Sequence, residues 1–171
     1  MLRYRGFPAR VRCGFATYFQ PEQALDHWIT EYWDALKRRW IRVDSEIMGQ
    51  SILEEPEDLA PGHFLSGGEA WAAFRDGAID ASRFGVYGTS NFGAAEIRGN
   101  AVKDLAALNK VEMLPWDEWG RMTEAYNNET GPDYDAILDS IARVTATNDY
   151  DGISNLYCRS DDLRVPDHLV R

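Results

Sequence analysis

The sequence predicts an α+β protein in which an antiparallel β-sheet near the N-terminus is followed by a mainly helical C-terminal segment. Alternating polar and apolar residues, typical of half-buried strands, fill the first quarter of the chain, and apolar spacings of three and four residues follow later. A chain of 171 residues with 44% apolar content and six Trp is long and apolar enough for one core. We therefore expect a single domain, with strands in residues 1–52 and an acidic, mainly helical segment in residues 53–171.

The first strand is expected within residues 8–19, where Val11, Cys13 and Phe15 alternate with polar or small residues. Two further strands are expected at 27–33 and 40–44. A short polar loop separates them, so an antiparallel hairpin is the simplest connection.

The register of this hairpin can be tested by pairing residues across it. If Trp33 faces Trp40, then Glu31 faces Arg42, which gives one aromatic pair and one pair of opposite charges. A slip by two residues is the alternative register. Both keep the same side chains on the same face of the sheet.

An imidazole and a carboxylate share one face of the hairpin in either register. His27 lies one diagonal step from Asp44 in the first register and directly opposite it in the second. A carboxylate beside an imidazole orients a catalytic base in nucleophile–His–Asp sites. A His–Asp pair at a strand end is nevertheless more often a surface hydrogen bond, so the spacing alone does not establish catalysis.

The later segment carries four expected helices, separated by a loop-like, glycine-rich stretch at 85–99. Apolar stripes in these helices indicate core packing. The helices are expected at residues 70–75, at 101–109 with Asn100 as the N-terminal cap, from Pro115 onward, and at 133–147.

Net charge and cysteine usage exclude several classes of protein. Residues 1–43 hold eight basic and four acidic side chains, but the whole chain has a net charge of −10. Nucleic acids and anionic membranes require a positive footprint, so neither is expected as a partner. No apolar run approaches the roughly 18 residues of a membrane span. Two cysteines without metal-ligand spacing indicate a cytoplasmic protein with no metal or cofactor.

Three blocks of the first quarter, in this order, resemble motifs of the transglutaminase-like superfamily of cysteine-dependent enzymes. They are Arg5–Val11, Asp26–Trp33 and Trp40–Asp44. The resemblance implies a papain-like core, of which residues 1–52 would be a remnant, with His27 as the catalytic base and Asp44 as the residue that orients it. It also implies thiolate attack on a protein or peptide amide, with release of the acyl group to water or an amine.

The family's nucleophilic cysteine lies in a Gly-x-Cys-x-Asp-like motif at the start of a helix, and Leu2–Pro8 resembles the end of that helix. We therefore expect either a truncated enzyme or a degenerate remnant, inactive as written. The alternative is a non-catalytic binding or scaffold domain derived from the same fold. A sheet face without its helix would be uncovered, which makes a homodimer through that face a reasonable expectation.

Cys13 has the required chain order, Cys…His…Asp, and its neighbours Arg10 and Arg12 would favour a thiolate if they lay close to the sulfur. Its position in the middle of an alternating strand instead favours a buried core residue over a nucleophile. Cys158 is likewise expected to be a packing residue.

Further blocks in the acidic segment resemble a bacterial branch of the same superfamily, without implying a substrate. They offer four candidates for a binding surface, each more often structural in role, with Asn100 as a cap and Trp116 as a core residue. The four are Arg98, Asn100, Asn109 and Trp116.

Overall fold

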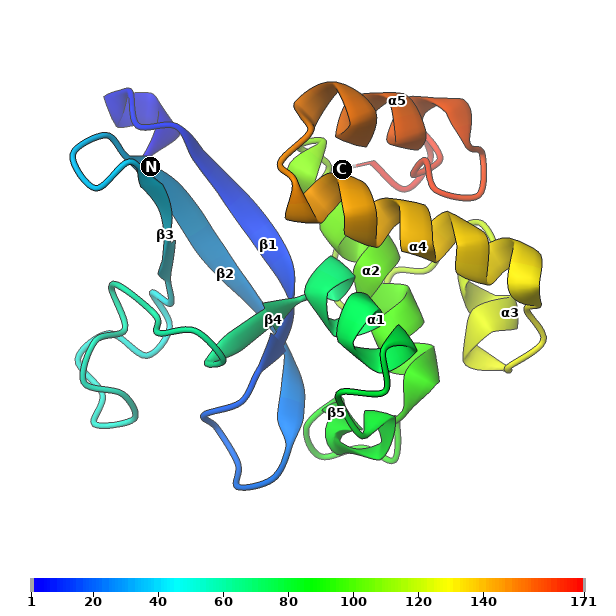
Figure 1. The fold of residues 1–171 in the computed structure, drawn as a ribbon, viewed down its shortest axis with the longest axis horizontal. Coiled ribbons are helices and arrows are strands. Elements are labelled where there is room, and N and C mark those ends of the chain that lie inside the picture. The colour runs from blue at the N-terminus through cyan, green and yellow to red at the C-terminus, as the bar shows by residue number, and fades with distance from the viewer. Residues whose placement is uncertain (1, 171) are drawn as a thin grey trace.

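The computed structural model describes residues 2–170, which form an α+β structure with the sheet beside the helices (Figure 1). The strands are β1 (Ala9–Ala16), β2 (Ala24–Asp34), β3 (Arg39–Val43), β4 (Phe64–Ser66) and β5 (Phe84–Gly85). The helices are α1 (Gly67–Arg75), α2 (Ala94–Leu108), α3 (Met122–Tyr126), α4 (Pro132–Ala146) and α5 (Tyr150–Arg159).

The sheet has the order β3-β2-β1-β4, and each of these neighbouring pairs is antiparallel. β5 adds two residues that run parallel to β2, a pairing that the sequence did not predict. Trp33 faces Trp40 and Glu31 faces Arg42, so the first of the two predicted registers is confirmed. The prediction of an α+β protein with an antiparallel sheet is confirmed, but the strands are not confined to residues 1–52, because β4 and β5 also join the sheet.

Successive strand residues point to opposite faces of the sheet, which divides β1 and β2 into two chemically different surfaces. Arg10, Arg12, His27 and Glu31 share one surface, here named the arginine face. Cys13, which pairs with Trp28, belongs to the other surface, named the cysteine face.

Helix α2 is the centre of the helical part and packs against β1, α1, α3 and α4. Its buried side chains form the main core together with those of the neighbouring elements. Helix α1 begins with a capping box, in which Ser66 and Glu69 each bond the other's backbone N–H. Between residues 2 and 170, no helix has the length and apolarity needed to cross a bilayer.

The structure corrects the expected starts of two helices. The stretch 85–99 is not a loop throughout, because α2 begins at Ala94, after Gly93 turns the chain with φ of 115°. Asn100 therefore lies inside α2 and is no cap. The segment after Pro115 forms turns, and the next helix begins only at Met122. The predicted helix at 133–147 is confirmed as α4, shifted by one residue.

Candidate functional site

His27 and Asp44 meet on the arginine face, where β2 begins and β3 ends. The distance from His27 Nε2 to Asp44 Oδ2 is 2.8 Å. Asp44 is held in place by two further donors: the Tyr18 hydroxyl donates to Oδ2 at 2.5 Å, and the Glu46 N–H donates to Oδ1 at 2.9 Å. A buried carboxylate with this many donors is fixed in orientation, so it also fixes the imidazole.

Aromatic rings surround the imidazole. The Phe19 ring meets it edge to face at a centroid distance of 4.9 Å, and the Tyr18 ring does so at 6.3 Å. Burial and the hydrogen bond to Asp44 raise the pKa of Tyr18 above its ordinary value, so Tyr18 is a neutral donor. The His27 side chain is only 9% exposed.

Only one nitrogen of His27 is engaged by the residues that the structure describes. Nε2 contacts Asp44, and this is the hydrogen bond that the His27 ring makes within residues 2–170. An imidazole oriented through one nitrogen can accept or donate a proton at the other. The geometry therefore suits a base that works on a group placed against Nδ1.

Cys13 is not such a group. It pairs with Trp28, and Gly14 pairs with His27, so the thiol lies on the opposite face of the sheet from the imidazole. Its Sγ lies 3.0 Å from Asn100 Oδ1 of α2 in a fully buried position. The prediction of a core residue is confirmed.

The electrostatic surroundings of Cys13 also oppose a thiolate. Burial raises the pKa of the thiol well above its usual range, and the carboxylates of Asp26 and Asp104 raise it further. Lys103 and Arg12 act in the opposite direction without reversing the shift. The predicted assistance from basic neighbours does not produce a reactive thiol.

Cys158 is exposed on α5, so its expected role in packing is wrong. Helix α5 buries Ile153 and Tyr157 instead. These two residues are four apart and therefore share one face of the helix, which Cys158 does not.

The four candidates for a binding surface do not form one site. Asn100 is buried, and Asn109 donates to the Leu105 carbonyl of its own helix. Arg98 donates to the Asn128 side chain. Trp116, expected in the core, is 73% exposed because the turn after Pro115 carries it to the surface.

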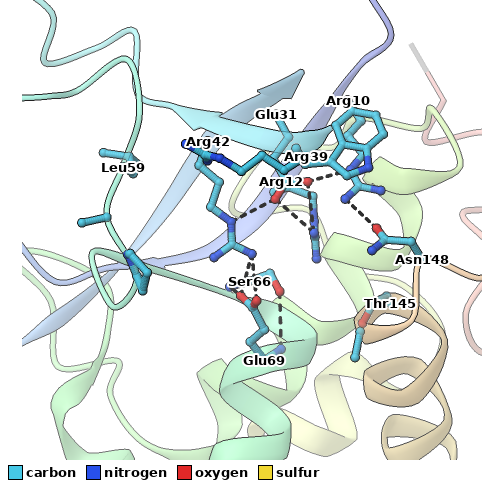
Figure 2. A pocket seen from close by; sticks show the side chains of 14 residues that line it. Arg10, Arg12, Glu31, Arg39, Arg42, Leu59, Ser66, Glu69, Thr145 and Asn148 are labelled. Atoms are coloured by element: carbon cyan, nitrogen blue, oxygen red, sulfur yellow. Dashed lines mark hydrogen bonds and ion pairs between the residues drawn. The ribbon is translucent and has the colours of Figure 1, made fainter. Parts of the chain in front are cut away.

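A guanidinium cluster, defined as Arg10, Arg12 and Arg42 around Glu31, occupies the arginine face (Figure 2). The shortest contacts to the Glu31 oxygens are 2.6 Å from Arg10, 3.2 Å from Arg12 and 2.9 Å from Arg42. Burial alone would raise the pKa of Glu31, but the three guanidinium groups together lower it to about 2. Glu31 is therefore a buried carboxylate that stays ionised.

Each arginine of the cluster also has a second partner outside Glu31. These partners are Asp104 for Arg12, Glu69 for Arg42 and Asn148 for Arg10, each at 2.8 Å. The cavity of about 320 Å³ beside the cluster is lined by these three arginines, by Arg39, and by the carboxylates of Glu31 and Glu69. We interpret the cluster as a structural connection between the sheet and the helices.

Sequence reasoning did not find Tyr18, the third partner of the His27–Asp44 pair, or the sharing of Glu31 by three arginines. The spacing of Arg10 and Arg12 was the sequence feature that could have indicated this sharing. The two residues are two positions apart, so both lie on one face of a strand. The order of the strands was also needed, because only a β1–β2 pairing brings that face to Glu31.

Comparisons of the chain with protein-family models, with curated proteins and with solved structures find no match.

Proposed function

We propose that the chain is related to the transglutaminase-like superfamily and that His27 and Asp44 form the acid–base pair of a cysteine-dependent amide hydrolase or acyl transferase. The observation that carries the proposal is the 2.8 Å contact from Nε2 to a carboxylate fixed by two other donors. This contact leaves Nδ1 as the nitrogen that would exchange protons with a thiol.

In the proposed reaction, His27 carries the proton both when the thioester forms and when it is released. A thiolate attacks the carbonyl carbon of a protein or peptide amide, and the imidazolium of His27 donates its proton to the departing amine. The resulting thioester is then attacked by water or an amine, which gives up a proton to His27. Neither cysteine is paired with His27 in residues 2–170, so we expect no turnover from this chain by itself.

An N-terminally extended protein, translated from the in-frame codons that precede Met1, tests the proposal. We expect a thiol-directed amide probe to label a cysteine in the added segment, about 100-fold more slowly in His27→Ala. His168→Ala, which changes an exposed histidine, is the matched control and should label at the normal rate.

Two results would contradict different parts of this proposal. Stoichiometric labelling of Cys13 in the 171-residue chain, lost in His27→Ala, would retain His27 as the base but contradict the expected lack of turnover in this chain. Preceding codons that encode no cysteine, or labelling indifferent to His27, would favour a non-catalytic domain.

A non-catalytic binding or scaffold domain is the second candidate, and the low exposure of His27 favours it. In this reading, the His27–Asp44 contact is a structural hydrogen bond. A homodimer is the proposed partner, through the outer part of the cysteine face, where Val11, Tyr32 and Val43 border a groove of about 740 Å³. Sedimentation that finds only monomers at high concentration would exclude this dimer.

A further inference from the structure

A second cavity, of about 510 Å³, lies away from the guanidinium cluster. It is open on one side and is lined by the start of α2, by residues 86–92 and 115–118, and by Tyr126 at the end of α3. Asp26 and His27 are adjacent in β2 and point to opposite faces of the sheet, so this cavity does not share the face of the proposed acid–base pair. Its volume is typical of sites for small molecules.

Glu96, in the first turn of α2, is the unusual side chain of this cavity. It lines the cavity, the residue is only 7% exposed, and its carboxylate makes no hydrogen bond or ion pair with residues 2–170. Buried carboxylates in proteins are ordinarily paired, because desolvation of an unpaired charge is costly. Glu31 of the guanidinium cluster, with three cationic partners, is the ordinary case.

The charges around Glu96 leave the cavity negative. Asp26 and Glu118 also line it, and the buried Oδ1 of Asp26 has no hydrogen-bond partner among the described residues. The nearby cation is Lys103, whose Nζ donates to the Pro115 carbonyl. Burial raises the pKa of Glu96 to about 7, with Lys103 opposing the shift and Asp26 and Glu118 adding to it. When all three of these carboxylates are ionised, their negative charges exceed the single positive charge of Lys103 by two.

Aromatic rings supply the remainder of the lining. Phe92, Trp116 and Tyr126 contribute to the wall, and Trp116 is the largely exposed one. The faces of such rings attract organic cations, most strongly in Trp. Residues 2–170 hold no group of three His, Cys, Asp or Glu side chains that could bind a metal ion. Carboxylates next to aromatic rings are better suited to an alkylated ammonium group.

We propose that this cavity binds a small organic ammonium cation of the quaternary or methylated class, with its charge facing Glu96 and its methyl groups against the aromatic rings. The proposal is independent of any role of His27. A negative cavity attracts the charge of the ligand, and the rings replace the water that its methyl groups lose.

Choline is the probe, and 3,3-dimethylbutanol is the neutral ligand of the same shape. Titration calorimetry at pH 8 should give saturable choline binding with a Kd on the order of 1 mM or tighter. The neutral alcohol and potassium ion should each bind at least about tenfold more weakly, since each lacks either the charge or the methyl groups.

Two variants locate the site. Glu96→Gln keeps the shape of the side chain and should weaken choline binding about tenfold or more, whereas Glu54→Gln, an exposed change of the same charge, should alter it less than about twofold. Trp116→Ala removes an exposed ring and should weaken binding about threefold or more without unfolding the protein.

The pH dependence gives a second readout. Choline affinity of the unmodified protein should rise as the pH increases through about 7, and that rise should disappear in Glu96→Gln. Absence of saturable choline binding, equal binding of the neutral alcohol, or normal affinity in Glu96→Gln would each overturn the proposal.

Discussion

At the scale of single residues, two buried glutamates respond to burial in opposite ways because their neighbours differ. Glu31 faces three guanidinium groups, and its pKa is lowered to about 2. Glu96 has only the charge of Lys103 to oppose desolvation, and its pKa is raised to about 7. The two groups therefore make the stability of the fold depend on pH with opposite signs.

Replacement of Glu31 by Gln should destabilise the protein by about 3–5 kcal/mol at pH 7, because three partly or fully buried guanidinium groups lose their shared carboxylate. The stabilisation from Glu31 is fully present above its unfolded pKa of 4.5 and is lost as the pH falls through about 2. Urea unfolding should therefore show the two proteins converging over that range. Glu112→Gln, in a surface pair with Arg3, is the control and should cost less than about 1 kcal/mol.

Replacement of Glu96 by Gln should have the reverse effect. The stability contributed by a raised carboxyl pKa is present below 4.5 and is lost as the pH rises through about 7. At pH 8 the variant should thus be more stable by up to about 3 kcal/mol, and near pH 4 the difference should vanish. Thermal unfolding at both pH values measures this; a variant less stable at pH 8 would contradict the assigned environment.

The sequence was sufficient for contacts within one hairpin but not for those between distant elements. Cross-strand pairing predicted Glu31 beside Arg42 and brought His27 close to Asp44. The unpaired carboxylate of Glu96 could not be predicted from the sequence, because the start of α2 lies in a glycine-rich stretch that is typical of a loop. Burial of a charge depends on the neighbours that the whole fold supplies.

At the scale of elements, the contact between α1 and α2 depends on a glycine. A Cβ at Gly67 would lie 2.1 Å from the Asn100 carbonyl oxygen, which is closer than any side chain allows. The backbones of the two helices can approach this closely only because residue 67 has no side chain.

Gly67→Ala should therefore force α1 and α2 apart and lower the free energy of unfolding by about 2 kcal/mol or more. Gly131→Ala at the start of α4 is the control, since its Cβ would meet only the exposed Asp133 side chain at 3.3 Å. Chemical denaturation of both variants provides the comparison. Equal stability of the two would show that the helix crossing tolerates an added methyl group.

The sequence predicted the elements that have strong periodic patterns. It did not predict the boundaries of elements whose ends are determined by turns. The strands near Cys13 and the helix at 133–147 carry clear alternation or apolar stripes. Helix α2 extends seven residues before its predicted start, through residues that include Gly99. Tertiary packing sustains this helix against a local preference for turns, because Ile97 and Ala101 are fully buried there.

At the scale of the whole molecule, the sheet and the helices share charged and backbone contacts. Asp104 of α2 accepts two hydrogen bonds from the Arg12 guanidinium, both at 2.8 Å, and one from the Cys13 N–H at 3.1 Å. Arg10 reaches Asn148 beyond the end of α4 in the same way. These contacts connect the basic N-terminal part of the chain, residues 1–43, with the acidic part that follows it.

We expect the protein to unfold as one cooperative unit. Near-ultraviolet circular dichroism reports on aromatic packing, including Trp33 and Trp40 of the sheet, and the signal at 222 nm reports mainly on the helices. Both transitions should coincide in urea. Asp104→Asn should shift both midpoints together, whereas two separate transitions would show that the sheet and the helices fold independently.

The position of Asp104 has a consequence for solubility. Strand β4 pairs with β1 only from Gly14 to Ala16, so the preceding part of β1 would present an open edge to other chains. Open strand edges are templates for intermolecular pairing and amyloid-like growth. By accepting the Cys13 N–H, Asp104 occupies a bond that an incoming strand would need. Loss of this side chain should therefore promote aggregation even under conditions where the protein remains folded.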